Sequence, residues 1–374
     1  MSEHLDALRR VVDEVVAPEA PAVDRDGTFP QRSLDALATA GILGLTVSAD
    51  HGGGAGTMRQ AAEVVQRLAG TCGSTAMVVL MHYTATAAIT GHGSESVRKA
   101  VASGQHLTTL AFSEAGSRSH FWAPQSTATA DADSVLLDAR KSWVTAAGHA
   151  DSYVWSSRPL AAEGPMTLWL VPATAAGLAQ PSGFDGLGLR GNSSTPVTAE
   201  KVRVAKDDML GEDGTGLDVA LAEILPWFLV LSGAFCVGLM EAVTAETGTH
   251  LTSTRLDHLD HSLAQQLLTR VDHARMRLLT DQASAFVGDT LSALETGRPD
   301  AMLRVLEVKA AAAEASIAVT DLAMKVCGGA AFRKELGIER AFRDARAARV
   351  MAPTTDALLD FVGRAINGLP LLDA

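Results

Sequence analysis

Residues 111–120 read AFSEAGSRSH and residues 141–145 read KSWVT. Each stretch adjoins a short apolar run of the kind that forms a strand, residues 107–113 for the first and residues 134–137 for the second. Small hydroxyl residues and glycine follow these runs, and such residues let a backbone approach a flat ligand closely. The two stretches therefore predict a ligand site built on strand ends.

The second stretch supplies an aromatic side chain and a hydroxyl. Trp143 and Thr145 are two residues apart, so on a strand they would face the same side. An indole beside a hydroxyl donor suits an aromatic ring system with a hydrogen-bonding edge. In the alternative interpretation, Trp143 is a core aromatic while Ser113 and Ser119 only shape a loop.

Taken together, the two stretches resemble the flavin-facing signature of the acyl-CoA dehydrogenases. That signature runs from Phe-Ser-Glu-Pro-Gly-x-Gly-Ser-Asp to Lys-x-Trp-Ile-Thr, and the interval between its halves also matches. The resemblance implies an FAD-binding protein. It implies flavin contacts from five residues: Phe112, Ser113, Ser119, Trp143 and Thr145.

A third motif lies near the C-terminus, where residues 327–332 read CGGAAF and residues 338–346 read IERAFRDAR. It is similar to the family's Gly-Gly-x-Gly and Arg-Asp-Ala segments, which belong to a four-helix domain holding the adenine half of FAD across a subunit interface. The resemblance therefore implies a homotetramer or homodimer. Arg255 matches the family arginine that binds the flavin pyrophosphate of a neighbouring subunit, or else is a solvated helix charge. The other cofactor contacts that the resemblance implies are Lys325, Gly328, Gly329 and Thr354.

This chain departs from the family pattern around the adenine half. Lys325 replaces a glutamine, Ala331 replaces a glycine, and His258-Leu259 replaces an aromatic residue and glycine. These changes bear on FAD affinity and on the choice of FAD over FMN. FAD remains the expected cofactor.

Hydrophobic periodicity divides the chain into three parts. Residues 1–106 are predicted to be helical, residues 107–210 hold short β-rich runs, and residues 211–374 return to long helical stretches. No helical period links the β runs, which favours a compact antiparallel barrel or sandwich over a Rossmann unit. The predicted fold class is α+β, in the helical–β–helical order of the resembled family.

Composition limits the classes of function. The formal net charge of −12 argues against a nucleic-acid partner, and 47% hydrophobic with 20% charged residues is typical of a soluble globular protein. No uncharged apolar run of 18 residues occurs, so no membrane span is expected. Three scattered cysteines and the lack of a secretion signal favour reduced thiols in the cytoplasm.

The residue expected to act as catalytic base is missing. Nine residues beyond Arg343 the family carries a glutamate that removes the α-proton of the acyl thioester, and this chain has Ala352 there. A second family position for the base falls on Phe228, which accepts no proton either. General-base catalysis contributes roughly 10²–10⁴-fold. A replacement base remains an alternative, with four candidates: Asp356, Glu223, His120 and His82.

A flavin site without that base favours an oxygenase or oxidase of specialised metabolism that uses dioxygen. His120 stands where the family has Asp and is the candidate donor to a developing oxyanion, or else a loop histidine bonded to backbone. The candidate acyl pocket combines Ser119, Phe121, Trp122 and Phe228, whose aromatic rings favour a cyclic or aromatic acyl group. The carrier is coenzyme A or a carrier protein, and a flavin reductase or an electron-transfer flavoprotein is the expected redox partner.

Two alternatives to that function remain open. One is α,β-desaturation with a relocated base, and the other is a non-catalytic structural homologue. Two local patterns receive simpler explanations. Residues 52–56 (GGGAG) are predicted to be a plain turn, since no strand leads into them. Residues 257–261 (DHLDH) are predicted to be a polar outer face and not a metal site.

Overall fold

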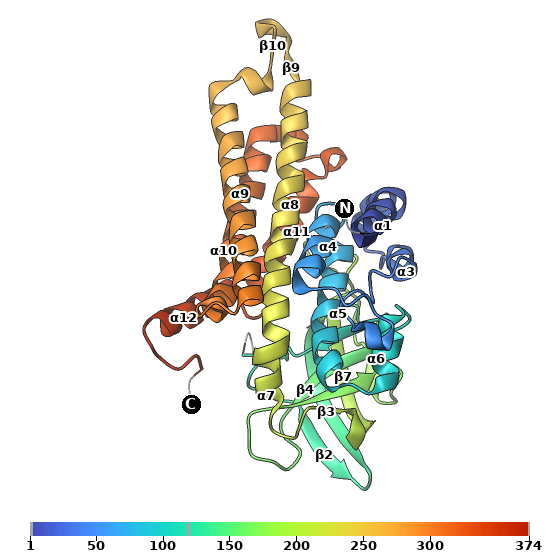
Figure 1. Ribbon diagram of the computed structural model, residues 1–374. Coiled ribbons are helices and arrows are strands. Elements are labelled where there is room, and N and C mark those ends of the chain that lie inside the picture. Colours follow the sequence, from blue (N-terminus) through green and yellow to red (C-terminus); the bar gives the residue numbers. More distant parts are fainter. Residues whose placement is uncertain (1–2, 118–119, 373–374) are drawn as a thin grey trace. The chain divides into compact units, whose positions relative to one another are not determined.

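A computed structural model describes residues 3–117 and 120–372, and its contacts divide the chain into two compact units. Unit 1 comprises residues 1–64, 77–186 and 190–228, and unit 2 comprises residues 65–76, 187–189 and 229–374. The helical–β–helical order predicted from the sequence is confirmed (Figure 1). The domain boundaries at residues 106 and 210 stay predictions.

The N-terminal part of unit 1 is helical because its apolar residues recur at helical spacing and its helices end at glycines. Gly27 adopts a left-handed conformation directly after α2, and the Ser94 hydroxyl accepts the Val97 N–H at the start of α6. Residues 52–56 form the predicted turn, packed on residues 44–48. The helices are α1 (Glu3–Val11), a π-helical turn (Val12–Val16), α2 (Ala17–Asp26), α3 (Gln31–Thr39), α4 (Met58–Ala69), α5 (Gly73–His92) and α6 (Glu95–Ala102).

Two four-stranded sheets follow in unit 1. The first has the order β1-β4-β5-β8, and the second has the order β2-β3-β7-β6. Tyr153, Trp155 and Trp169 are almost fully buried on the central strands of the first sheet. The strands are β1 (Thr108–Ala111), β2 (Thr127–Asp131), β3 (Ser134–Val144), β4 (Ser152–Ser157), β5 (Thr167–Pro172), β6 (Leu178–Ala179), β7 (Thr195–Ala205) and β8 (Met209–Leu210).

The expectation of a purely antiparallel β region is wrong at one place. β1 and β4 pair in parallel, from Thr108 opposite Ser152 to Ala111 opposite Trp155. A parallel pair needs a crossover connection, and here strands β2 and β3 of the other sheet lie between β1 and β4 in the sequence. Because the chain passes from the first sheet to the second and back, the residues that follow β1 lie next to β3, where Glu114 pairs with Lys141.

Residues 211–216, which follow β8, do more than connect two helical or β regions, because Asp213 binds a neighbouring loop. Asp213 accepts N–H bonds from Leu160, Ala161 and Ala162, each at 2.8 Å, and the Thr167 hydroxyl at 2.6 Å. Burial alone would raise the pKa of Asp213, but these donors hold it below its ordinary value. The carboxylate thus fixes the β4–β5 loop and is not a free solvated charge. A short helix, α7 (Gly216–Val219), follows and leads through a π-helical turn into α8.

Unit 2 is a helical bundle in which α10 is central, because it packs against α9, α11 and α12. The hairpin β9–β10 joins α8 to α9, which run side by side (Figure 1). Helix α11 was not predicted as a separate helix. The elements are α8 (Leu225–Ser253), β9 (Arg255–Leu256), β10 (His261–Ser262), α9 (Leu267–Thr296), α10 (Ala301–Cys327), α11 (Ile338–Val350) and α12 (Thr355–Ile366).

The continuous helical stretch Gly216–Ser253 is long and apolar enough to cross a membrane by composition, although no span was expected. Of its most apolar window, 78% is buried inside the protein. That burial is characteristic of a core helix.

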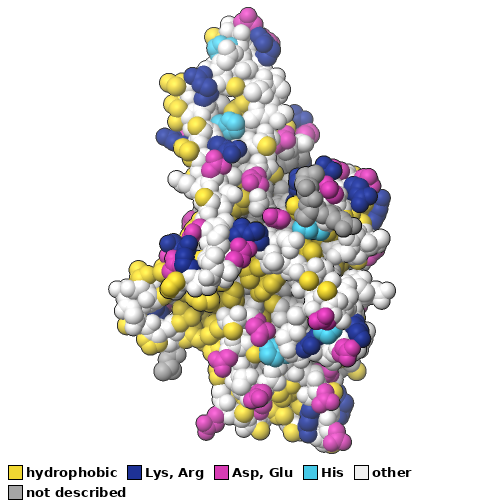
Figure 2. Space-filling model, in the orientation of Figure 1, with side chains coloured by type: hydrophobic (Ala, Val, Ile, Leu, Met, Phe, Trp, Pro, Cys, Tyr) yellow, Lys and Arg dark blue, Asp and Glu magenta, His cyan; other side chains and the backbone are white. Residues whose placement is uncertain are grey.

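Exposed hydrophobic side chains lie on α9 (Figure 2), including Leu267, Leu268 and Leu278.

Candidate functional site

The two signature stretches lie side by side in unit 1, as predicted. The Ala115 N–H donates to the Arg140 carbonyl at 3.1 Å, and the Ser142 N–H donates to the Ser113 carbonyl at 2.9 Å. Between these two bonds Glu114 pairs with Lys141. The end of β1 and the end of β3 therefore form one local unit, although 27 residues separate Glu114 from Lys141.

A buried ion pair fastens the two stretches together. The Lys141 ammonium donates to Glu114 Oε1 at 2.5 Å, to the Ser156 carbonyl at 2.7 Å and to the Ser156 hydroxyl at 2.9 Å. Glu114 also accepts from the Ser126 hydroxyl and from the N–H groups of Gln125 and Ser126. Both charges are thus satisfied by hydrogen bonds, as buried charges must be.

Burial and pairing act in opposite directions on these two groups. Burial lowers the pKa of Lys141 to about 8, against the opposing effect of the Glu114 charge. For Glu114, burial alone would raise the pKa, but the Lys141 charge and the hydrogen bonds outweigh it and hold the pKa below its ordinary value. Both groups are therefore charged near neutral pH, and the pair is a structural clamp rather than a source of protons.

Trp143 departs from strand geometry. Its φ is +57°, and the pairing of β3 with β7 is irregular between Lys141 and Val144. Trp143 is consequently 69% exposed, whereas Thr145 is only 5% exposed. Trp143 and Thr145 were predicted to face the same side of a strand. That prediction is wrong, since the backbone is not extended at Trp143.

This arrangement nevertheless fits a flat aromatic cofactor. A large, exposed indole stands beside a buried hydroxyl, and left-handed backbone at a non-glycine residue is strained and concentrates at ligand sites. Phe112 and Ser113 are half-buried at the end of β1. Ser119 lies outside the described residues.

Sequence reasoning missed a polar segment that completes this surface. The Thr145 hydroxyl lies 3.0 Å from the Ser194 hydroxyl. Asn192 Oδ1 accepts the Ser194 N–H at 3.1 Å, and the Asn192 carbonyl accepts the Ala146 N–H at 2.9 Å. The only hint in the sequence was a run of polar residues directly before β7.

Three aromatic rings follow the first stretch. His120 is exposed and its Nδ1 lies 3.0 Å from the Ser117 carbonyl, the arrangement of the simpler loop interpretation. Its ring meets the edge of Trp122 at 4.9 Å, and Trp122 meets Phe121 at 5.2 Å. The cluster is one continuous aromatic surface, with Phe121 buried and Trp122 half-buried.

In unit 2, the two basic residues predicted to bind cofactor each form an ion pair with an aspartate. Arg255 pairs with Asp260 at 2.5 Å, and Lys325 pairs with Asp272 at 2.7 Å. Gly328 has a φ of +55°, and a β-carbon on Gly328 or Gly329 would meet no other atom within 4 Å. The two glycines are thus an open, exposed turn at the end of α10.

The segment containing Ala352 is held from both sides. Lys309 is fully buried and its ammonium donates to the carbonyls of Ala348, Met351 and Pro353 at 2.8–3.0 Å. Burial lowers the pKa of Lys309 to about 8. The hydroxyl of Thr354 accepts the Ala357 N–H at 3.3 Å and caps α12. Ala352 therefore lies on a connection between α11 and α12 that these hydrogen bonds hold in place.

The four candidate replacement bases differ in their surroundings. Glu223 pairs with His92 at 2.9 Å. His82 is fully buried between the Leu43 carbonyl and the Thr108 N–H, and burial lowers its pKa to about 4. Asp356 and His120 are exposed. Phe228, at the family's second position for the base, is buried on α8.

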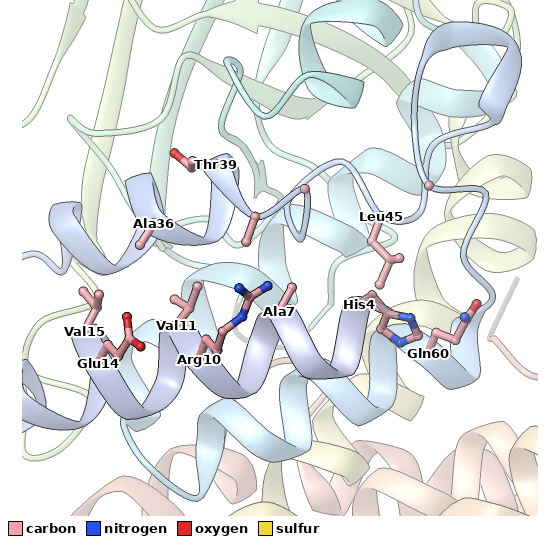
Figure 3. A pocket seen from close by; sticks show the side chains of 13 residues that line it. His4, Ala7, Arg10, Val11, Glu14, Val15, Ala36, Thr39, Leu45 and Gln60 are labelled. Carbon is pink, nitrogen blue, oxygen red and sulfur yellow. The ribbon is translucent and has the colours of Figure 1, made fainter. Parts of the chain in front are cut away.

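A well-defined hollow lies elsewhere in unit 1. It measures about 780 Å³ and opens between α3 and the wall formed by α1 with the following turn (Figure 3). Ala7, Val11 and Val15 face Ala36 across it, with Arg10 and Glu14 at its edge. None of the residues predicted for cofactor or substrate lines this hollow. No cluster of three metal-ligating side chains occurs within residues 3–117 and 120–372.

Comparison with known proteins gives matches along almost the whole chain. Three family models match: the acyl-CoA dehydrogenase N-terminal domain at residues 2–104, the middle domain at residues 109–202 and the C-terminal domain at residues 214–367.

Individual relatives agree with these matches. The human mitochondrial short-chain specific acyl-CoA dehydrogenase is 26% identical over 94% of this chain and 86% of its own length. A cyclohex-1-ene-1-carbonyl-CoA dehydrogenase of Geobacter metallireducens is 25% identical over 97% of this chain and 96% of its own. The crystal structure of a prolyl acyl carrier protein oxidase superposes with a TM-score of 0.88 at 18% identity, covering 98% of this chain and 99% of that one.

Proposed function

Because this chain belongs to the acyl-CoA dehydrogenase family, whose members are FAD-dependent oxidoreductases acting on acyl-CoA, we propose that it is an acyl-thioester oxidase or oxygenase. The observation that carries the proposal is Ala352. The resemblance of the C-terminal motif implies that Ala352 stands where the family carries its carboxylate, and Lys309 and Thr354 hold the backbone on either side of it. Dehydrogenation by the usual route would lack its proton acceptor.

Bound FAD would supply the two-electron redox chemistry, and the protein would supply its position. Trp143 offers an indole face and Thr145 a hydroxyl, while the Glu114–Lys141 pair keeps the two strand ends together. In a neighbouring subunit, as the family resemblance implies, the open turn at Gly328-Gly329 and the guanidinium of Arg255 would hold the rest of the dinucleotide. A guanidinium already paired with a carboxylate must exchange that partner for phosphate.

The substrate is proposed to be a cyclic or aromatic acyl thioester. The ring cluster of His120, Phe121 and Trp122 supports this by its continuous aromatic surface. The names of two similar proteins describe cyclic acyl groups as substrates. One name gives a cyclohexenecarbonyl-CoA, and the other gives a prolyl group on an acyl carrier protein. His120 is the proposed donor toward a developing oxyanion, with dioxygen as the second substrate. A flavin reductase or an electron-transfer flavoprotein is the proposed source or acceptor of electrons.

Assembly into a homotetramer or homodimer is also proposed. Hydrophobic side chains exposed on the helices of unit 2 support it, notably Leu267, Leu268 and Leu359. The three cysteines are free and buried, in keeping with a proposed cytoplasmic location.

One experiment separates the candidate functions. The purified, FAD-loaded protein is mixed with a panel of acyl-CoA and acyl-carrier thioesters, first without air and then with oxygen-18 gas and a reductant. Oxygen-18 in the product supports oxygenation, and hydrogen peroxide formed with thioester and air but without the added reductant supports oxidation.

Anaerobic bleaching of the flavin with an α,β-unsaturated product and no reaction with oxygen contradicts the proposal. Such a result favours a dehydrogenase with a relocated base, the activity that the names of the human and Geobacter relatives describe. A protein that takes up neither FAD nor FMN is the non-catalytic homologue.

A further inference from the structure

The hydroxyls of Thr145 and Ser194 form a buried pair joining two segments that are far apart in the sequence. Their oxygens are 3.0 Å apart across a separation of 49 residues, and the side chains are 5% and 9% exposed. Neither the sequence motifs nor the comparisons assign a role to Ser194. We propose that Ser194 is a positioning residue, which orients the Thr145 hydroxyl toward the edge of the cofactor ring. This inference rests on the proposed flavin site.

The position of Ser194 is set by its own segment and not by the cofactor. Asn192 is 2% exposed and its Oδ1 accepts the Ser194 N–H at 3.1 Å. The Ala146 and Ala147 N–H groups donate to the carbonyls of Asn192 and Ser193 at 2.9 and 3.2 Å. The backbone that follows Thr145 is thereby tied to the backbone that carries Ser194, so the two hydroxyls are held opposite each other.

A hydroxyl has one hydrogen and two acceptor positions, so its orientation decides what it can offer. When Ser194 donates to Thr145, the Thr145 hydrogen is free to be donated to an acceptor on a ring edge. Without the Ser194 hydroxyl, the Thr145 hydroxyl can rotate among its staggered orientations. The Ser194 hydroxyl forms its hydrogen bond with the Thr145 hydroxyl. The pair is therefore suited to set one direction for Thr145.

Backbone strain provides a second, independent observation. Trp143, Ala146 and Ser193 all lie in the left-handed region, with φ between +50° and +57°. Residues with a β-carbon avoid that region unless the surroundings enforce it, and such residues cluster at ligand sites. Here they flank the hydroxyl pair on both segments. The strained backbone thus coincides with an exposed indole and two buried hydroxyls.

The test compares FAD binding in four variants prepared as apoprotein: Ser194→Ala, Ser194→Thr, Thr145→Ala and the double variant Ser194→Ala/Thr145→Ala. Binding is titrated by flavin fluorescence, and the visible absorption spectrum of the bound cofactor is recorded. Loss of one buried hydrogen bond weakens binding by about three- to tenfold. We expect that loss for Ser194→Ala, with a shifted absorption band, and recovery of both in Ser194→Thr.

If Ser194 acts through Thr145, the double variant should show no added effect of Ser194→Ala. In the Thr145→Ala background, removing Ser194 should change neither affinity nor spectrum, because the residue it orients is gone. Ser33→Ala is the matched control, since Ser33 is also a fully buried serine with one side-chain hydrogen bond, to Glu19 on α2. It should leave the affinity and spectrum of bound FAD unchanged.

The outcomes distinguish this inference from the proposed function. Wild-type protein that binds no FAD overturns both. Wild-type protein that binds FAD while Ser194→Ala binds it equally well, with the same spectrum, overturns only the role of Ser194. Equal effects of Ser194→Ala in the presence and absence of Thr145 also overturn it, because they indicate a general structural effect.

Discussion

At the scale of single residues, the two stretches that suggested a ligand site turn out to contain its clamp as well as its contacts. Glu114 and Lys141 belong to the quoted motifs, yet neither faces a ligand, since their side chains are almost fully buried against each other. The residues offered to a ligand are Trp143, through its exposed indole, and Thr145, through its hydroxyl. Motif positions thus divide into structural and binding residues, and spacing alone does not separate them.

Removing one partner of the clamp should be costly. Lys141→Met leaves Glu114 as a buried carboxylate without its counter-charge, so we expect a loss of about 3–5 kcal/mol in the free energy of unfolding. Urea denaturation followed by circular dichroism measures it. The double variant Glu114→Gln/Lys141→Met should lose clearly less than Lys141→Met alone. An equal or larger loss in the double variant would show that the charge pair is not the cause.

His82 should make stability depend on acid. Its folded pKa of about 4 lies below the ordinary 6.5, because burial disfavours the charged imidazole. The unfolded chain therefore takes up a proton first as the pH falls, and the stability contributed by neutral His82 is present above pH 6.5. It is lost progressively between about pH 6.5 and 4, to a total of about 3 kcal/mol. Urea unfolding at stepped pH should show a shallower decline for His82→Gln than for wild type.

At the scale of elements, loops in this chain are fixed by single side chains that collect several backbone groups. Asp213 gathers three N–H groups of the β4–β5 loop, and Lys309 gathers three carbonyls at the end of α11. Each replaces hydrogen bonds that a regular element would supply. Such residues are hard to recognise in a sequence, because their partners are backbone atoms of any residue type.

The Asp213 contact predicts a local effect. Asp213→Ala removes the acceptor of the Leu160, Ala161 and Ala162 N–H groups, so these amides should exchange hydrogen faster while the sheets stay protected. Each lost hydrogen bond contributes about 1 kcal/mol net, which corresponds to roughly fivefold faster exchange. Mass spectrometry of deuterium uptake resolves the loop. Glu212→Ala, its exposed neighbour, is the control and should leave the loop unchanged.

The sequence predicted most elements but not the local departures from regular structure. Among the β-rich runs predicted within residues 107–210, those at residues 153–156 and 166–171 form β4 and β5, since these residues are buried on both faces of the strands. The parallel pairing of β1 with β4 could not be foreseen, since strand periodicity does not encode direction. The different exposure of Trp143 and Thr145 was not predicted for a similar reason, because an irregularity in β3 and the left-handed backbone at Trp143 interrupt the alternation of faces along a strand.

At the scale of the whole molecule, the family's architecture is present, and we propose that one of its chemical groups, a carboxylate at position 352, is replaced by a methyl group. Restoring that group should alter the reaction. Ala352→Glu adds a carboxylate to the α11–α12 connection, so we expect anaerobic flavin bleaching by saturated acyl-CoAs to accelerate by at least tenfold, up to the roughly 10²–10⁴-fold that a general base contributes. Stopped-flow absorbance measures it. Ala352→Gln is the matched control of nearly equal size and should bleach no faster than wild type.

The fluorescence of Trp143 should report whether the proposed flavin site is occupied. It is the one exposed indole among five, whereas Trp155 and Trp169 are fully buried. Its emission should therefore lie at longer wavelength than theirs and respond first to acrylamide as a quencher. When a yellow chromophore stacks on that ring, energy transfer should extinguish this red-edge component selectively, so filling of the site can be followed optically without a label.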